Sequence, residues 1–150
     1  MIFERTTKPH FAFNLRIPVG SAHDIRGHEG ASKLLRGWMF EGAGARDAKA
    51  WRDARDELGL SCGLRGGYQA STFWGRGLTE DLEMGMALTA DVLMRPLFPD
   101  DQFGVHLDLM RQSIEEIEDS PSSVLNVKSQ ELSFPTPEDE PYVGFTRSAT

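Results

Sequence analysis

The spacing of apolar residues is the feature that most restricts the fold of this chain. From Phe11 to Val19, apolar side chains recur at every second position, which predicts a strand with one buried face. From Ala31 to Met39 and from Phe103 to Ile117 they recur at intervals of three and four, as they do along one face of a helix. The chain must therefore combine a sheet with amphipathic helices.

Helical segments outnumber strands, and most of them come late. Strands are predicted at residues 11–19, 61–65 and 69–76, and helices from 31 to the glycines near 42, then at 47–58, 79–94, 101–118 and 121–132. This order is typical of an α+β fold, a two-layer sandwich with helices on one face of a mainly antiparallel sheet. Because the sheet is small for so many helices, we expect residues 1–150 to form a single, incomplete domain, the N-terminal part of a larger one.

Local signals fix several of these boundaries. Asp47 and Thr79 are predicted to cap the helices that follow them, and the pair Gly66-Gly67 predicts a hairpin turn. Beyond residue 133 the chain is rich in Pro and Glu and is expected to be irregular.

Charge and composition exclude several classes of partner. The net charge is −7, whereas nucleic acids and anionic membranes bind clustered Lys and Arg. No apolar run could cross a bilayer, and the start of the chain lacks the pattern of a signal peptide. The one cysteine, Cys62, is interpreted as a small buried apolar residue. We therefore expect no nucleic-acid partner, no membrane association and a cytoplasmic location.

Several short segments occur in an order that resembles a known family of zinc peptidases. They are Val19-Gly20-Ser21-Ala22-His23-Asp24, Gly30 to Gly42, Asp56-Glu57-Leu58-Gly59 with the hairpin after it, residues 81–98, Glu118-Asp119-Ser120-Pro121, and Pro141-Tyr142. In this order they resemble the insulinase, pitrilysin and mitochondrial processing peptidase family of inverted zincins. The resemblance covers roughly residues 11–142 and implies a processing-peptidase-like fold.

The residues that would carry the family's chemistry are different in this chain. The family binds zinc with both His of H-x-x-E-H, and the Glu between them polarises the attacking water. The resemblance places Lys33, Arg36 and Gly37 at these positions, and Gln112 or Ser113 at the position of the third ligand, a Glu. Arginine stays charged and cannot act as a base, and glycine has no side chain. We therefore expect no catalytic residue, no bound zinc and no activity of the chain on its own.

The resemblance also implies a role and a partner. Members of the family are built from paired homologous units, of which only one holds zinc. We expect this chain to be the non-catalytic unit, which forms a substrate chamber with a catalytic homologue and helps to bind an extended peptide. Candidate peptide-binding residues are Lys33 and Arg36, with Phe73 and Trp74 if their strand lies at a sheet edge and can receive a peptide strand.

Two other interpretations remain open at this point. The chain could be an active zinc peptidase with atypical ligands, or a stand-alone peptide-binding or scaffold module. The spacing of His residues does not favour the first, since His28-Glu29 lies in a glycine-rich loop and lacks a second His four residues on. His10 and His106 are isolated in the sequence and are assigned to no site.

Overall fold

The computed structural model describes residues 9–133 and the pair 141–142, apart from the side chains of residues 130 and 131. The irregular structure expected at residues 134–140 therefore lies outside the described residues. The main elements are β1 (His10–Ile17), α1 (Ala31–Trp38), β2 (Gly42–Ala43), β3 (Arg46–Asp47), α2 (Ala48–Glu57), β4 (Ser61–Arg65), β5 (Ser71–Leu78), α3 (Leu82–Met94), α4 (Asp100–Glu118) and α5 (Pro121–Ser133). No helix among these residues is long and apolar enough to cross a membrane.

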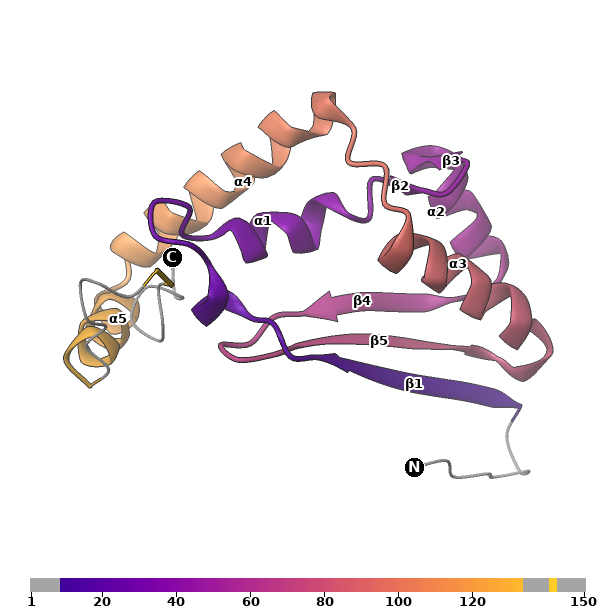
Figure 1. Cartoon of the computed structure of the whole chain (residues 1–150), viewed down its shortest axis with the longest axis horizontal. Coiled ribbons are helices and arrows are strands. Elements are labelled where there is room, and N and C mark those ends of the chain that lie inside the picture. Colours follow the sequence, from indigo (N-terminus) through magenta and orange to yellow (C-terminus); the bar gives the residue numbers. More distant parts are fainter. Residues whose placement is uncertain (1–8, 134–140, 143–150) are drawn as a thin grey trace.

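The fold is α+β, as predicted. Strands β1, β5 and β4 form an antiparallel sheet with β5 in the centre, and β2 and β3 form a separate two-residue ladder. Helices α1, α2 and α3 lie on one side of the sheet, and α4 lies beyond α1, farther from the strands (Figure 1). Helix α4 packs on α1, and the contact between them, where Lys33 and Gly37 of α1 meet Ser113 and His106 of α4, is called the seam.

Two phenylalanines on β1 are each paired with a glycine on β5. Phe13 on β1 is paired with Gly75 on β5, and a Cβ atom at Gly75 would lie only 2.4 Å from the Phe13 ring. The neighbouring pair, Phe11 and Gly77, has the same arrangement, with a separation of 3.0 Å. Glycine on β5 therefore lets the aromatic rings of β1 lie flat across the sheet, as in other strands where an aromatic ring covers a cross-strand glycine.

The core is centred on Phe73 of β5. This side chain is completely buried and its ring centroid lies 6.4 Å from that of Phe13 and 5.9 Å from that of Phe40. Trp51 of α2 and Val92 of α3 are also fully buried. Cys62 packs against this core and is half-buried, and burial raises the pKa of its thiol, which agrees with its interpretation as an apolar residue.

Some boundaries differ from the prediction for identifiable reasons. Asp47 caps α2 as expected, since its Oδ1 accepts a hydrogen bond of 2.8 Å from the Ala50 amide. Strand β5 begins two residues later than predicted because the carbonyls of Gly67 and Tyr68 accept hydrogen bonds from the turn at residues 21–22. Thr79 was wrongly predicted as a helix cap, since Thr79–Asp81 form a short 3-10 helix ahead of α3.

We expect Phe73→Ala to lower the free energy of unfolding by about 3–5 kcal/mol, because it removes a buried ring at the centre of the core. Chemical denaturation followed by circular dichroism measures this loss. Met94→Ala is the matched control, since Met94 is 80% exposed and its truncation should change stability by less than about 0.5 kcal/mol. Equal unfolding midpoints for the two variants would contradict the packing described here.

Candidate functional site

A buried carboxylate holds the start of α1. Asp24 is 8% exposed, and its oxygens accept hydrogen bonds from the amides of Gly30 at 3.0 Å and Ser32 at 3.1 Å, and from the Ser32 hydroxyl at 3.2 Å. These amides belong to the positive end of the helix, which a carboxylate stabilises. Gly30 has φ +91°, a left-handed conformation that favours glycine, so the chain can turn sharply into α1 there.

Lys33 and Ser113 meet across the seam between α1 and α4. The Lys33 ammonium donates a hydrogen bond of 2.8 Å to Ser113 Oγ, and the Ser113 hydroxyl donates to the Met110 carbonyl, also at 2.8 Å. These two residues were predicted to occupy the positions of the family's first and third zinc ligands. Of the two candidates for the third position, Ser113 faces the seam and Gln112 is exposed.

His106 fills the space beside Gly37. A Cβ atom built on Gly37 would lie 2.8 Å from His106 Nδ1, so the imidazole of α4 packs directly on the bare backbone of α1. His106 Nε2 also lies 3.3 Å from Glu41 Oε1, in a direction that makes no hydrogen bond, so the contact is an ion pair only when the imidazole is protonated. An imidazole thus occupies this part of the seam, but it comes from α4 rather than from α1.

The charged end of Arg36 points away from that of Lys33, toward the hairpin loop between β4 and β5. Its guanidinium packs on the hairpin loop so closely that a Cβ atom at Gly66 would lie 1.8 Å from Nη1. Burial lowers the pKa of Arg36 and the nearby Asp24 carboxylate opposes this shift. Because the ordinary pKa of a guanidinium is so high, Arg36 remains charged at neutral pH and cannot serve as a general base.

Each of these two cations borders a small cavity. The first cavity has a volume of about 190 Å³ and lies in the seam; the second, about 250 Å³, lies between α1 and the hairpin loop. The first is lined by Lys33, Leu34, Gly37, His106, Leu109, Met110 and Ser113. The second is lined by Ser21, Arg36, Gly66, Gly67 and Tyr68. Positions 33, 37 and 113 therefore line one cavity, and position 36 lines another.

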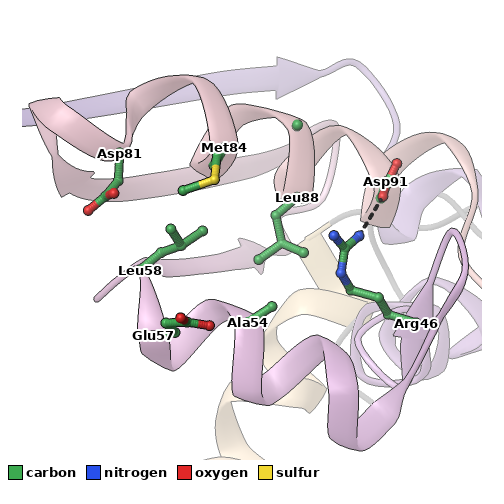
Figure 2. A pocket seen from close by; sticks show the side chains of 9 residues that line it. Arg46, Ala54, Glu57, Leu58, Asp81, Met84, Leu88 and Asp91 are labelled. Carbon is green, nitrogen blue, oxygen red and sulfur yellow. Dashed lines mark hydrogen bonds and ion pairs between the residues drawn. The ribbon is translucent and has the colours of Figure 1, made fainter.

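A larger cavity of about 500 Å³ lies between α2 and α3, away from these positions (Figure 2). Its middle is apolar, with Leu58 and Leu88 pointing into the space between the helices. Arg46 lies at one end, where it forms an ion pair of 3.4 Å with Asp91. Glu57 and Asp81 lie at the other end, so this cavity is acidic where the two cavities beside α1 are cationic.

The residues in the seam do not fit a zinc ion. A protonated lysine has no lone pair, glycine has no side chain, and a catalytic zinc needs three protein ligands of the His, Cys, Asp or Glu type. Within the part of the chain that the structure describes, no three such residues are grouped closely enough to hold a metal. The donor set itself, an ammonium hydrogen-bonded to a hydroxyl, is therefore unsuited to the family's metal.

The structure changes the role open to Phe73 and Trp74. Strand β5 was considered as a sheet edge that could receive a peptide strand, but it is hydrogen-bonded to β1 on one side and β4 on the other. The condition for strand addition, an edge position of β5 in the sheet, is therefore not met, and the buried Phe73 side chain cannot reach a ligand. Trp74 is half-buried on the opposite face, with the Arg65 guanidinium 5.2 Å from its ring centroid.

His106 is the residue of this site that the sequence interpretation missed. It was interpreted as an isolated residue at the surface or on the flank of a helix, whereas the structure places its half-buried side chain against Gly37. A signal was nevertheless present, since His106 precedes Ser113 by seven residues, which places both on the same face of α4 two turns apart.

Comparison with known proteins identifies the family. The family model described as Insulinase (Peptidase family M16) matches residues 1–134. The chain belongs to the insulinase family of peptidases, M16. Similar proteins include two described as uncharacterized zinc proteases, from Rickettsia bellii and Rickettsia felis, each 26% identical over 117 residues. The match covers 78% of this chain but 28% of either relative, so the chain spans less than a third of their length.

Solved structures show the same fold. The inactive domain of a peptidase M16 from Pseudomonas fluorescens superposes with a TM-score of 0.77 and 22% identity, covering 83% of this chain and 31% of that one. A protease from Helicobacter pylori superposes with a TM-score of 0.75 and 14% identity, covering 83% and 30%. This M16 chain thus has the same fold as these solved structures.

We expect Asp24→Ala to lower the free energy of unfolding by about 2–3 kcal/mol, because it leaves two amides at the start of α1 without their acceptor. Thermal or urea unfolding measures the change. Asp56→Ala is the control, since Asp56 forms only an exposed ion pair with Arg55, of the kind that contributes little. A loss no larger than that of the control would show that Asp24 does not hold the helix.

A zinc site should be recoverable only if His106 is removed as well. We compare a fourfold variant, Lys33→His, Arg36→Glu, Gly37→His and Ser113→Glu, with a fivefold variant that adds His106→Ala. Because any side chain at position 37 collides with His106, the fivefold variant should bind close to one equivalent of zinc and the fourfold variant far less.

Zinc bound after dialysis is measured by mass spectrometry, with the unaltered chain beside both variants. Equal zinc in the two variants would mean that His106 does not occupy the ligand space. One equivalent of zinc in the unaltered chain would overturn the description of the seam.

Proposed function

We propose that this chain is a non-catalytic unit of an insulinase-like zinc metallopeptidase. In this proposal it forms one side of a substrate chamber with a catalytic homologue and helps to hold an extended peptide. The observation that carries the proposal is the pair of contacts between α1 and α4, the Lys33–Ser113 hydrogen bond and the packing of His106 on Gly37, because they lie where the resemblance to zinc peptidases would place metal ligands.

Contacts between α1 and α4 span the seam although it cannot bind zinc. A hydrogen bond joins residues that are 80 positions apart in the sequence, and an imidazole covers the backbone of Gly37 beside the cavity of about 190 Å³. These contacts hold the two helices together without a metal, which supports a role that depends on shape and contacts.

Two comparisons support the same role. The similar structure from Pseudomonas fluorescens is described as an inactive domain, so the fold exists without activity in that protein. The zinc proteases from Rickettsia are more than three times as long as the segment that matches, so in those relatives the matched unit works beside further chain. A non-catalytic unit beside a catalytic one is consistent with both facts.

Co-expression tests the partnership. The chain is produced with an M16 homologue from the same genome that carries an intact H-x-x-E-H motif, and the two are purified through a tag on one of them. We expect a stoichiometric complex that cleaves a long peptide at least several-fold faster than the homologue alone, because the chamber needs both halves.

A complex in which the homologue's catalytic Glu is replaced by Gln serves as the control and should be inactive, which assigns the chemistry to the partner. Failure of every such homologue to associate, together with unchanged cleavage, would overturn the proposal. Peptide binding by the chain without any association would favour a stand-alone binding module instead.

A further inference from the structure

Two half-buried cations of α1 stand out in an acidic chain. Among the described residues, neither Lys33 nor Arg36 has a carboxylate within ion-pair distance, although the net charge of the chain is −7. The other Arg and Lys side chains in this part of the chain are in ion pairs, have another partner, or are exposed. Those in ion pairs are Arg46, Lys49, Arg52, Arg55, Arg95 and Arg111; Arg26 and Lys128 have other partners; Arg16, Arg65 and Arg76 are exposed.

The Lys33 ammonium can donate more hydrogen bonds than the one it makes to Ser113. It carries three N–H groups and donates one of them to Ser113 Oγ. The cavity beside it is otherwise lined mainly by apolar side chains, including Leu34, Leu109 and Met110. A cation in such surroundings is poorly solvated and attracts an anion more strongly than it would in water. A carboxylate could accept from both Lys33 and a reoriented Ser113 hydroxyl, which are the charge-assisted bonds that it prefers.

Arg36 offers a second position for an anion nearby. Its guanidinium borders the cavity between α1 and the hairpin loop, where the glycines at 66 and 67 bring only backbone close to it. Lys33 and Arg36 are three residues apart on one helix, so their Cβ atoms are neighbours on its surface, about 5–6 Å apart. Their charged ends diverge, because one faces α4 and the other faces the hairpin.

We propose that Lys33, Ser113 and Arg36 form a subsite for acidic peptide segments. Lys33 and Ser113 hold one carboxylate in the seam, and Arg36 holds a second beside the hairpin. An extended peptide advances about 3.3 Å per residue, so carboxylates two to four residues apart, about 7–13 Å, suit two cations that diverge from one helix. The inference rests on the proposed function in taking a peptide as the ligand, but it requires no partner subunit.

The carboxylates could come from Asp and Glu side chains or from the C-terminus of a peptide. Both present the same oxygen acceptors to Lys33 and Arg36, and only a comparison of peptides separates them. The α2–α3 cavity, with Glu57 and Asp81 at one end, is unsuited to either source and provides a control region on the same molecule (Figure 2).

Fluorescence anisotropy with labelled peptides tests the subsite on the 150-residue chain. The set contains an extended peptide with alternating Asp and Glu, the same peptide with Asn and Gln, and both in free and amidated C-terminal forms. We expect the acidic peptide to bind about ten-fold or more tightly than its neutral counterpart, and this advantage to shrink as salt is raised. An advantage that survives amidation assigns the carboxylates to side chains; one that requires a free C-terminus assigns one of them to the terminus.

Matched variants locate the effect. Lys33→Gln and Arg36→Gln should each remove most of the preference for the acidic peptide, and Ser113→Ala should reduce it. Arg76→Gln and Glu57→Gln are the controls and should leave this preference unchanged, since Arg76 is exposed on β5 and Glu57 lies at the acidic cavity. Circular dichroism checks that each variant is folded. Where a variant is not, amide chemical shifts of the unaltered chain on titration with the acidic peptide decide, since changes confined to residues 32–37 and 106–113 support the subsite.

Equal affinity for acidic and neutral peptides, or an acidic preference that Arg76→Gln lowers as much as Lys33→Gln does, would overturn the inference. Either result leaves the partnership with a catalytic homologue standing. Conversely, failure to form that complex would overturn the proposed function without affecting an acidic preference measured on this chain alone.

Discussion

The geometry of the α1–α4 seam depends on one buried carboxylate. The Asp24 carboxylate accepts hydrogen bonds from two backbone amides and one hydroxyl at the start of α1. These bonds fix the residue at which the helix begins and the direction in which each of its side chains points. A rotation of about 100° separates successive residues of a helix, so a start one residue earlier or later would turn Lys33 away from Ser113. The direction in which Lys33, Arg36 and Gly37 face is thus set by a residue outside the helix.

Contacts from both helices hold the seam together. The resemblance to zinc peptidases would place metal ligands on α1, but α1 contributes Gly37 there and α4 contributes the imidazole of His106, which packs on it. The Lys33–Ser113 hydrogen bond adds a direct link across the seam.

The sequence was sufficient for the order and type of the elements, because the apolar periodicities of Phe11–Val19 and of the helices are long and regular. It was also sufficient to single out Lys33, Gly37 and Ser113, which the structure brings together at one cavity, whereas Arg36 lines another. It was insufficient wherever the deciding contact is distant in the sequence: the later start of β5 depends on hydrogen bonds from residues 21–22, and the role of His106 depends on a glycine 69 residues earlier. The central position of β5 likewise follows from pairing with β1, which periodicity cannot reveal.

The two Phe–Gly pairs between β1 and β5 have a consequence for how this sheet can diverge among homologues. A slip of two residues would keep every side chain on its own face, yet it would place Phe13 opposite Phe73 or Gly77 and leave one ring without its glycine. A side chain at Gly75 would likewise be compatible only with a smaller residue at position 13. These positions are therefore expected to change together in related sequences, and their covariation would record the strand register without any structure.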